Sequence, residues 1–398
     1  MWTVYRRLRC HLLNDGLGDR RLDHQQPDTL EKTPLCAAHE ALGARMVPFA
    51  GYLMPVQYPT GIIAEHNHTR EKCGLFDVSH MGQAWLKGPD FDTVAKAMET
   101  LVPADIASLE PGRQRYSQLL NDEGGCIDDL MIARSAHPDM QNGLFLVVNA
   151  SRKHIDFAHL RNHLADGIEL EELPQLALLA LQGPRAETVL ESLAPGVAAL
   201  EFMGGAPFTF GGDGIYVTRS GYTGEDGYEI SVPSSKAEAL WNALTAHHEV
   251  KPIGLGARDS LRLEAGLSLY GHELDETVSP VEASLLWSIP KQRREQGGFP
   301  GAARIQREIA EGPARKIVGI KPEGRAPARE GTVVMADGQE IGVITSGGFG
   351  PTVGGPVALG FVPPALAKPG TKLDLMVRGK ALPAEVVKLP FVKKSFKK

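Results

Sequence analysis

The pattern of the sequence changes after residue 311, and this change constrains the fold more than any other feature. Before Gly312 and Pro313, short apolar runs alternate with helical repeats, whereas afterwards strand-like runs follow one another with only turn signals between them. Strands without intervening helices must hide their edges, and a small closed barrel or roll achieves this. The sequence therefore predicts a separate all-β module over residues 312–392. Its strands are expected at 316–320, 331–335, 340–345, 357–362, 372–377 and 384–388.

Residues 34–311 mix strands and helices. The apolar run 144–148 predicts a strand, and Asn149 after it is a signal for the start of a helix. The run 176–181 leads into apolar residues with helical spacing, which predicts one buried stripe. A capping box that begins at Ser235 predicts the start of another helix. Because these elements do not alternate strictly as βαβ units, we predict an α+β fold for this region.

Composition and charge exclude several classes of protein. The 398 residues are 42% hydrophobic and 23% charged, and the longest near-apolar run, 176–181, is far shorter than the roughly 18 residues of a membrane-spanning helix. The net charge is −6 although residues 388–398 carry five lysines and no acid, so the body of the chain is strongly acidic. An acidic body repels phosphate backbones. We therefore expect neither a membrane span nor a nucleic-acid partner.

The two ends of the chain are predicted to be appendages. Residues 1–33 carry three arginines among the first ten positions and five acids after them, whereas transit peptides are poor in acids throughout. We interpret this segment as a flexible extension or a misassigned start, with a mitochondrial address as the alternative. The basic tail, residues 393–398, is interpreted as a solvated terminus, although its lysines also suit an acidic partner.

The sequence predicts no metal site and no disulfide, and it lacks the motifs of serine hydrolases and of nucleotide-binding loops. The four cysteines are widely separated and form no C-x-x-C pair, a pattern that fits a reducing compartment. His66 and His68 point to different faces of a helix, so they cannot share one metal ion there. The chain lacks the G-x-S-x-G motif of serine hydrolases, and its glycine-rich stretches near residues 347 and 354 do not precede a helix as nucleotide-binding loops do.

One segment with potential chemistry is residues 121–129. A glycine pair turns the chain there and presents Asp128 and Asp129 just before an apolar run. Adjacent side chains of a strand face opposite ways, so one of the two carboxylates is expected to point inward. A buried carboxylate is costly unless it has a partner or a function. The alternative is a turn with two solvated acids.

Two further segments combine glycine with charged residues. Residues 220–230 form a glycine-punctuated loop that is expected to expose Tyr222 and Glu225, followed by a strand in which Glu229 faces away from its two neighbours. A solvated polar face is the alternative explanation for Glu229. Arg258 lies near the start of a short predicted helix, where a cation is unfavourable unless an anion offsets it. That placement indicates a partner carboxylate, and a solvated arginine is the default alternative.

These segments belong to a set of seven motifs in a fixed order. The motifs are GYLMPVQY at 51–58, FDVSHM at 76–81, GCIDDL at 125–130, SGYTGEDGYEI at 220–230, ARDSLRLEAG at 257–266, DETVSP at 275–280 and PFV at 390–392. In order and spacing the chain resembles the T-protein family of the glycine cleavage system, the tetrahydrofolate-dependent aminomethyltransferases. The resemblance runs from about residue 33 to residue 392 and is specific, because seven ordered motifs do not recur by chance.

The resemblance implies both a fold and a reaction. The expected fold is a mixed α/β folate-binding region of two intertwined subdomains over residues 34–311, with the C-terminal β-barrel or jelly-roll-like module after it. The family moves the aminomethyl carbon of glycine from the lipoyl arm of the H-protein to tetrahydrofolate. The reaction releases ammonia and gives 5,10-methylenetetrahydrofolate, and it uses tetrahydrofolate as a co-substrate with no metal or redox cofactor.

The resemblance also assigns residues. Asp128 matches the family's catalytic carboxylate, where a fixed anion lowers the barrier as the reacting carbon gains iminium character. Glu229 matches the acid that pairs with the pterin, since two carboxylate oxygens suit two parallel N–H donors. Arg258 matches the arginine that contacts folate. The remaining positions expected to line the folate site are Tyr116, Asn149, Tyr222 and Met54.

Two other functions on the same fold remain open at this point. One is a folate-dependent demethylase, and the other is a non-enzymatic folate-binding factor for iron–sulfur assembly. The second branch carries a cysteine where this chain has residues 220–227, which argues against it. The chain departs from the family at Phe396, where many members have tyrosine, so any hydroxyl contact there is lost. The family implies a cytoplasmic enzyme in a bacterium, with the mitochondrial matrix as the alternative.

Overall fold

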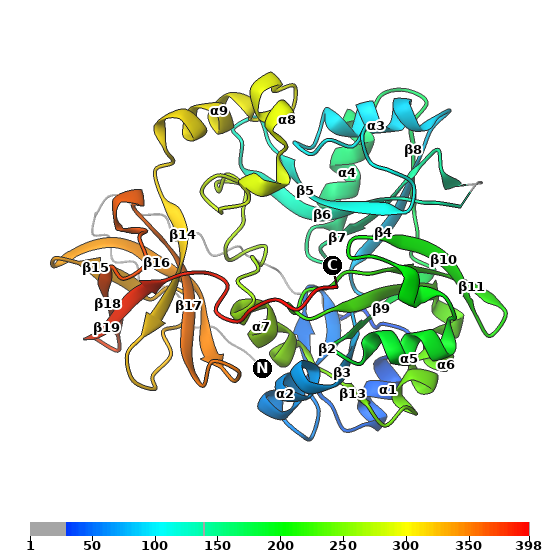
Figure 1. Cartoon of the computed structure of the whole chain (residues 1–398), viewed down its shortest axis with the longest axis horizontal. Helices are drawn as coiled ribbons and strands as arrows, with labels where there is room; N and C mark the ends of the chain where they lie inside the picture. The colour runs from blue at the N-terminus through cyan, green and yellow to red at the C-terminus, as the bar shows by residue number, and fades with distance from the viewer. Residues whose placement is uncertain (1–28, 138–139, 398) are drawn as a thin grey trace, which may run out of the picture.

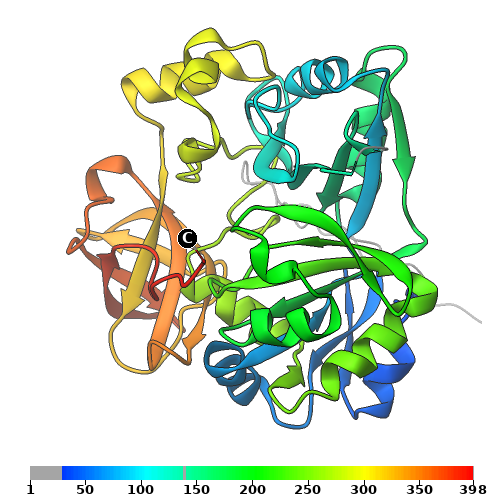
Figure 2. The same ribbon diagram turned by 45° about the vertical axis from the view of Figure 1, so that its right-hand side comes forward.

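The computed structural model describes residues 29–137 and 140–397 (Figure 1). Two β-sheets pack face to face beneath outer helices, and a barrel lies beside them (Figures 1 and 2). Most of the predicted extension, residues 1–28, lies outside the described residues. Residues 29–33 are attached to the fold, because the backbone of Glu31 hydrogen-bonds to Gly51 at 2.9 Å and the buried Thr33 donates to Asp77 at 2.6 Å. Within the described part of the chain, no helix has the length and apolar character needed to cross a bilayer.

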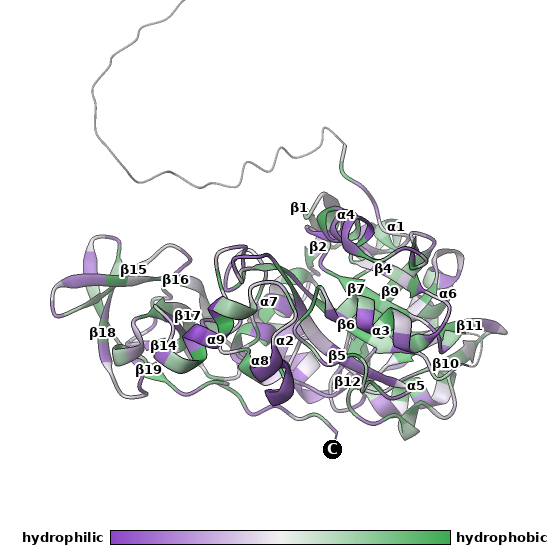
Figure 3. Cartoon of the chain, turned by 90° about the horizontal axis from the view of Figure 1, so that it is seen from above, coloured by the Kyte–Doolittle hydropathy of each residue, from purple (hydrophilic) through white to green (hydrophobic). Residues whose placement is uncertain are grey.

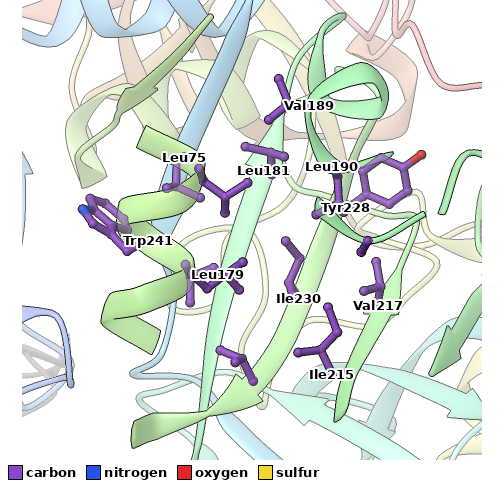
Figure 4. Packing of buried hydrophobic residues seen from close by; sticks show 14 of the residues in the cluster. Leu75, Leu179, Leu181, Val189, Leu190, Ile215, Val217, Tyr228, Ile230 and Trp241 are labelled. Carbon is purple, nitrogen blue, oxygen red and sulfur yellow. The ribbon is translucent and has the colours of Figure 1, made fainter. Parts of the chain in front are cut away.

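The larger sheet has six strands, and its outer face is covered by two helices. In spatial order the strands are β10 (Gly205–Phe210), β11 (Asp213–Thr218), β12 (Gly227–Pro233), β9 (Leu176–Gln182), β3 (Cys73–Asp77) and β13 (Val250–Pro252). The covering helices are α5 (Ala186–Leu193) and α6 (Ser234–Thr245). Alternate residues of the central strands, such as Leu179, Leu181 and Ile230, form one buried cluster with Trp241 of α6 and Leu190 of α5 (Figure 4). The predicted helix after Ser235 is confirmed, but it begins one residue earlier and has no side-chain cap, so the capping box is wrong.

The smaller sheet has five strands and its own pair of outer helices. Its strands in spatial order are β5 (Arg113–Leu120), β6 (Cys126–Arg134), β7 (Leu144–Val148), β4 (Gly82–Lys87) and β8 (Glu169–Glu172). The outer helices are α3 (Phe91–Glu99) and α4 (Lys153–His163). Its inner face packs on the inner face of the six-stranded sheet, where Trp85 and Phe145 meet Phe76 and Leu178. Strands β7 and β9 both contribute to this interior, and the green colour in Figure 3 marks their residues as hydrophobic.

The chain alternates between the two sheets before it reaches the barrel. Strand β3 belongs to the larger sheet and β4 to the smaller one, and the chain returns to the larger sheet only at β9. Strand β3 is preceded by α1 (Cys36–Ala41), β1 (Arg45–Phe49), β2 (Tyr52–Gln57) and α2 (Ile62–Glu71), and β13 is followed by α7 (Leu255–Glu264). A connecting region then follows, with the short 3₁₀-helix η3 (Leu286–Ser288) and helices α8 (Lys291–Gln296) and α9 (Ala302–Glu311).

The C-terminal strands close into a barrel, which confirms the predicted β module and decides for a barrel over a jelly roll. Its strands in spatial order are β14 (Lys316–Pro322), β17 (Gly355–Val362), β16 (Gln339–Gly350), β15 (Val333–Ala336), β18 (Lys372–Val377) and β19 (Lys380–Val387). The barrel is tied to α7 by Glu264, a buried carboxylate that accepts hydrogen bonds from the backbone of Thr352 at 2.8 Å and from Arg70 at 3.2 Å. His66 also contributes here, since its Nε2 lies 2.8 Å from the Thr352 hydroxyl.

The basic tail is not a solvated terminus. It runs from the barrel back to the larger sheet (Figure 1), where the backbone N–H of Ser395 donates to Gly224 at 2.9 Å. Lys397 pairs with Glu187 of α5 at 2.7 Å. Phe396 stacks on Phe202 with ring centroids 4.3 Å apart, so the ring packing expected at this position is present. The sequence interpretation of a free tail was wrong because the partners lie more than 150 residues away in the chain.

Candidate functional site

A narrow cavity lies between the inner faces of the two sheets. Its wall comes from alternate residues of six strands and is mostly apolar, with a few polar groups. The smaller sheet contributes Gln114, Met131, Ala133, Phe145 and Val147, and the larger sheet contributes Leu178, Tyr216, Thr218, Glu229 and Ser231. An apolar cavity with a few converging polar groups is typical of a site for a small organic molecule.

Glu229, Arg258 and Tyr222 form a cluster at one side of this cavity. Strand alternation places the neighbours of Glu229 in the helix-covered core, so Glu229 itself faces the cavity and not bulk solvent. Ser220 donates to Glu229 at 2.9 Å. Burial raises the pKa of Glu229 above its usual value, and the positive charge of Arg258 offsets only part of that rise. The guanidinium of Arg258 lies 4.9 Å from the ring centre of Tyr222, and its Nη1 is a buried donor without a hydrogen-bond partner among the described residues.

A second cluster lies on the smaller sheet, where Asn149 joins the two adjacent acids. Asn149 immediately follows β7, which pairs with β6, so its side chain reaches both carboxylates. Its amide Nδ2 donates to Asp128 Oδ1 at 2.9 Å and to Asp129 Oδ1 at 2.7 Å. Its backbone N–H donates to Asp128 Oδ2 at 3.0 Å. Tyr116 donates its hydroxyl to Asp129 Oδ2 at 2.9 Å.

The two acids face opposite sides of the sheet. Asp128 shares its face with Leu130, which packs under the outer helices, and it has no exposed surface. Asp129 shares its face with Met131, a residue of the cavity wall, and is only half-buried. Asp129 also lies close enough to Tyr222 for its charge to raise the pKa of that hydroxyl, which connects the two clusters. The cavity-side carboxylate is therefore Asp129, whereas the family resemblance had assigned the catalytic role to Asp128.

The other predicted site residues are placed as follows. Tyr116 lies on the cavity face of β5 and stacks on Trp287 of η3, with ring centroids 5.5 Å apart. Trp287 is 66% exposed, so this aromatic pair lies at the surface edge of the site. Tyr222 donates its hydroxyl to the backbone of Ser268. Met54 lies on β2 with no exposed surface, and no contact described here joins it to the other predicted residues.

The loop that was expected to expose Glu225 buries it instead. Glu225 is 8% exposed and pairs with Arg70 of α2 at 2.9 Å, while the hydroxyl of Ser395 in the tail also donates to it. The loop is thus held from two sides by segments distant in the sequence. This arrangement fixes the start of β12 and hence the position of Glu229.

Of the cavity residues described here, only Glu229 was identified from the sequence, and Gln114 and Tyr216 are the most informative of those that were missed. Both carry a buried polar atom without a hydrogen-bond partner among the described residues, Nε2 in Gln114 and the hydroxyl in Tyr216. Gln114 could have been found, because it precedes Tyr116 by two positions on a predicted strand and therefore shares its face. For Tyr216 the sequence holds no such signal.

The turn before the two acids is packed against the chain 150 residues later. The backbone N–H of Gly125 donates to Asn121 Oδ1 at 2.8 Å, and that of Cys126 donates to the carbonyl of Asp275 at 3.0 Å. A Cβ atom on Gly125 would lie 1.8 Å from the carbonyl oxygen of Glu276. Two of the seven motifs therefore meet at this point, and only glycine fits between them.

Replacing Gly125 with alanine is expected to lower the free energy of unfolding by about 1–3 kcal/mol, the usual cost of overpacking. The matched control is Gly214→Ala, because a Cβ atom at Gly214 has no neighbour within 4 Å and needs no unusual backbone angle. Urea unfolding of both variants measures the difference. Equal stabilities would mean that the contact with Glu276 does not constrain this turn.

The pKa of Asp129 makes stability depend on pH. Burial, and next the charge of Asp128, raise the pKa of Asp129 from its ordinary value of 3.8 to about 7. As the pH rises from about 4 to 7, the unfolded chain loses this proton before the folded protein does, so the free energy of unfolding falls. Asp129→Asn is expected to make that fall smaller, whereas Asp374→Asn on the barrel surface leaves it unchanged. Urea unfolding at pH 5 and pH 8 measures how much the free energy of unfolding changes between these pH values. An identical change in the original chain and in both variants would exclude a raised pKa at Asp129.

Comparison with known proteins agrees with this architecture. The family model described as the GCVT N-terminal domain matches residues 35–293, and the one described as the glycine cleavage T-protein C-terminal barrel domain matches residues 315–393. A mitochondrial aminomethyltransferase of Dictyostelium discoideum is 43% identical, over 93% of this chain and 94% of its own length. An aminomethyltransferase of Herpetosiphon aurantiacus is 41% identical, over 93% of this chain and all of its own.

A solved structure extends the similarity to the fold. The crystal structure of the glycine cleavage system aminomethyltransferase T from Bartonella henselae superposes with a TM-score of 0.88 at 42% identity, covering 93% of this chain and all of the other. None of these names favours the demethylase or the iron–sulfur assembly alternative. The chain therefore belongs to the glycine cleavage T-protein family of aminomethyltransferases.

Proposed function

We propose that this aminomethyltransferase moves the aminomethyl carbon from the lipoyl arm of an H-protein to tetrahydrofolate, with release of ammonia and formation of 5,10-methylenetetrahydrofolate. Membership of the family supports the reaction. The observation that carries the site assignment is that Glu229 lines the cavity from the larger sheet, while Asp129 shares its strand face with Met131, which lines the cavity from the smaller sheet. We place the reaction in the cytoplasm of a bacterium or in the mitochondrial matrix of a eukaryote.

The polar groups of the cavity suit a reduced pterin. Its edge offers adjacent N–H donors, and the carboxylate of Glu229 offers two acceptor oxygens with only Ser220 as a partner among the hydrogen bonds described. Its carbonyl needs a donor, and Arg258 Nη1 and Gln114 Nε2 are buried donors without partners among the described residues. Unpaired buried polar groups are costly, so a ligand that satisfies them gains affinity.

Asp129 is the carboxylate proposed to act on the reacting groups, in place of Asp128. Its anion is fixed by hydrogen bonds from Tyr116 and Asn149, so it is oriented before any substrate binds. A fixed anion favours positive charge that develops on the aminomethyl carbon as ammonia leaves. We assign it electrostatic stabilisation and positioning, because the folate nitrogens are nucleophilic without a strong base.

A single-turnover assay tests the proposal. The full chain is mixed with aminomethylated H-protein, with and without tetrahydrofolate, and methylenetetrahydrofolate and ammonia are measured. We expect stoichiometric formation of both products only when all three components are present. Failure to transfer the carbon, or transfer of equal rate without tetrahydrofolate, would exclude the function.

A further inference from the structure

A third acid, Asp156, lies beneath the two acids of the site and has no role in the proposed function. It is in the first turn of α4, the helix that covers the outer face of the smaller sheet. Asp156 and Asp128 both have no exposed surface. Neither oxygen of Asp156 receives a hydrogen bond from an N–H or O–H group of the described residues. Two acceptor oxygens without a donor are not stable in a buried position when they carry a full charge.

The carboxyl groups of Asp156 and Asp128 lie close enough to influence each other's pKa, although no N–H or O–H donor of the described residues reaches Asp156. Two ionised carboxylates are both acceptors only, so a hydrogen bond between them requires a proton on one of the two. Asn149 already donates to both oxygens of Asp128, at 2.9 and 3.0 Å, which favours the ionised form of Asp128. The shared proton therefore belongs to Asp156.

The groups around Asp156 and Asp128 favour a state in which the two acids together hold one proton and one negative charge. Burial, followed by the charge of Asp128, raises the pKa of Asp156 to about 10, so that it stays protonated at neutral pH. Arg152 is the cation that acts on Asp156, but its guanidinium donates to Ile127 at 2.9 Å and to Glu276 at 2.5 Å. The acid pair lies near the start of α4, where the helix dipole favours the one negative charge that the pair keeps.

We propose that Asp156 is a positioning residue that shares its proton with Asp128, and that this acid pair, acting through Asn149, orients Asp129 and places one negative charge behind it. The inference rests on the proposed role of Asp129. The link is direct, because the two hydrogens of the Asn149 amide bond one oxygen of each acid, at 2.9 and 2.7 Å. The other titratable or charged groups that interact with these acids are Tyr116, Cys126, Arg152, Tyr222 and Tyr270.

Two isosteric variants distinguish a shared proton from two separate charges. In Asp156→Asn the amide replaces the carboxylic acid as a neutral donor, so the charge behind Asp129 is kept and the midpoint of the pH–rate profile should stay where it is in the original chain. In Asp128→Asn that charge is lost, and the midpoint should fall by roughly one pH unit. Asp156→Ala, which removes the donor, should lower kcat by about 10-fold with little change in the KM for tetrahydrofolate.

Equal downward shifts in Asp156→Asn and Asp128→Asn would overturn the proposal, since both acids would then carry a charge. No shift in Asp128→Asn would overturn it as well. The exposed barrel residue Asp374 supplies the control, and Asp374→Asn should leave the profile unchanged. Thermal unfolding of each variant establishes that the comparison is made between folded proteins.

A measurement without substrate separates this inference from the proposed function. The full chain is labelled with ¹³C at the aspartate carboxyl carbons, and their signals are followed by NMR as the pH is raised. We expect one buried carboxyl to remain protonated through neutral pH, with its signal absent in Asp156→Asn. If every aspartate is ionised at pH 7, the shared proton is excluded whatever the activity. If Asp129→Asn turns over normally while that signal is present, the role of Asp129 fails and the acid pair remains as a structural feature only.

Discussion

Replacing Asp129 with asparagine is expected to lower kcat by about 10²–10³-fold, the usual cost of removing a group that stabilises charge in the transition state. The substitution keeps the shape of the side chain: its amide oxygen still accepts from Asn149, and its amide nitrogen donates to the Tyr116 hydroxyl in place of accepting from it, so the fold should be retained. The affinity for tetrahydrofolate should change little, because Glu229 lies on the opposite sheet and Arg258 on helix α7. A coupled assay with aminomethylated H-protein measures kcat, and calorimetry measures the affinity.

The adjacent acid is the matched comparison. Asp128→Asn is expected to reduce kcat much less than Asp129→Asn, since Asp128 faces α4 and reaches the site only through Asn149. If Asp128→Asn abolished turnover while Asp129→Asn did not, the assignment from the sequence would be right and the one from strand alternation wrong. Unchanged kcat in both variants would remove this pair of acids from the mechanism.

Replacing Glu229 with alanine should weaken tetrahydrofolate binding by about 10- to 100-fold. The change removes a charged acceptor and leaves the N–H donors of a bound pterin unpaired, a loss of roughly 1.5–3 kcal/mol. At saturating tetrahydrofolate, kcat should be nearly retained, because Glu229 binds the cofactor and does not contact the reacting carbon. Glu229→Gln keeps one acceptor oxygen and should give an intermediate loss.

The control for Glu229 is Glu238→Gln, on the exposed side of α6. It changes the same charge without touching the cavity and should leave the affinity unchanged. Titration calorimetry with tetrahydrofolate measures all four proteins under one set of conditions. An affinity of Glu229→Ala equal to that of the original chain would refute the contact between this acid and the pterin.

Local pattern was sufficient for most of the secondary structure. The six strands of the barrel follow from period-two apolar runs bounded by turn residues, and the stripe of Ala186, Val189 and Leu190 packs against the larger sheet as its spacing predicts. The capping box at Ser235 failed because the preceding strand ends at Pro233 and the helix starts directly after it. A short local signal such as a capping box is easily overridden when a neighbouring strand fixes where the helix begins.

The chemistry of the site was harder to predict. The motif that contains Asp128 and Asp129 identified the acidic pair, but the choice between them depended on which face of β6 meets the cavity. Asp129 lies on the same face of β6 as Met131, but the sequence does not show that this face meets the cavity. Only the packing of the two sheets shows it. Asp156 gave no signal at all, because an acid in the first turn of a helix is ordinary in a sequence.

The sequence by itself determined the order of the elements, the family and the residue types available for folate chemistry, since each depends on short-range periodicity or on motifs contiguous in the chain. The tertiary structure alone decided which acid faces the cavity, that a third acid lies behind it, and that the tail with Phe396 packs on the larger sheet. These features depend on contacts between segments far apart in the sequence. The burial and charge that such contacts create are properties of the assembled protein, and no local pattern of residues encodes them.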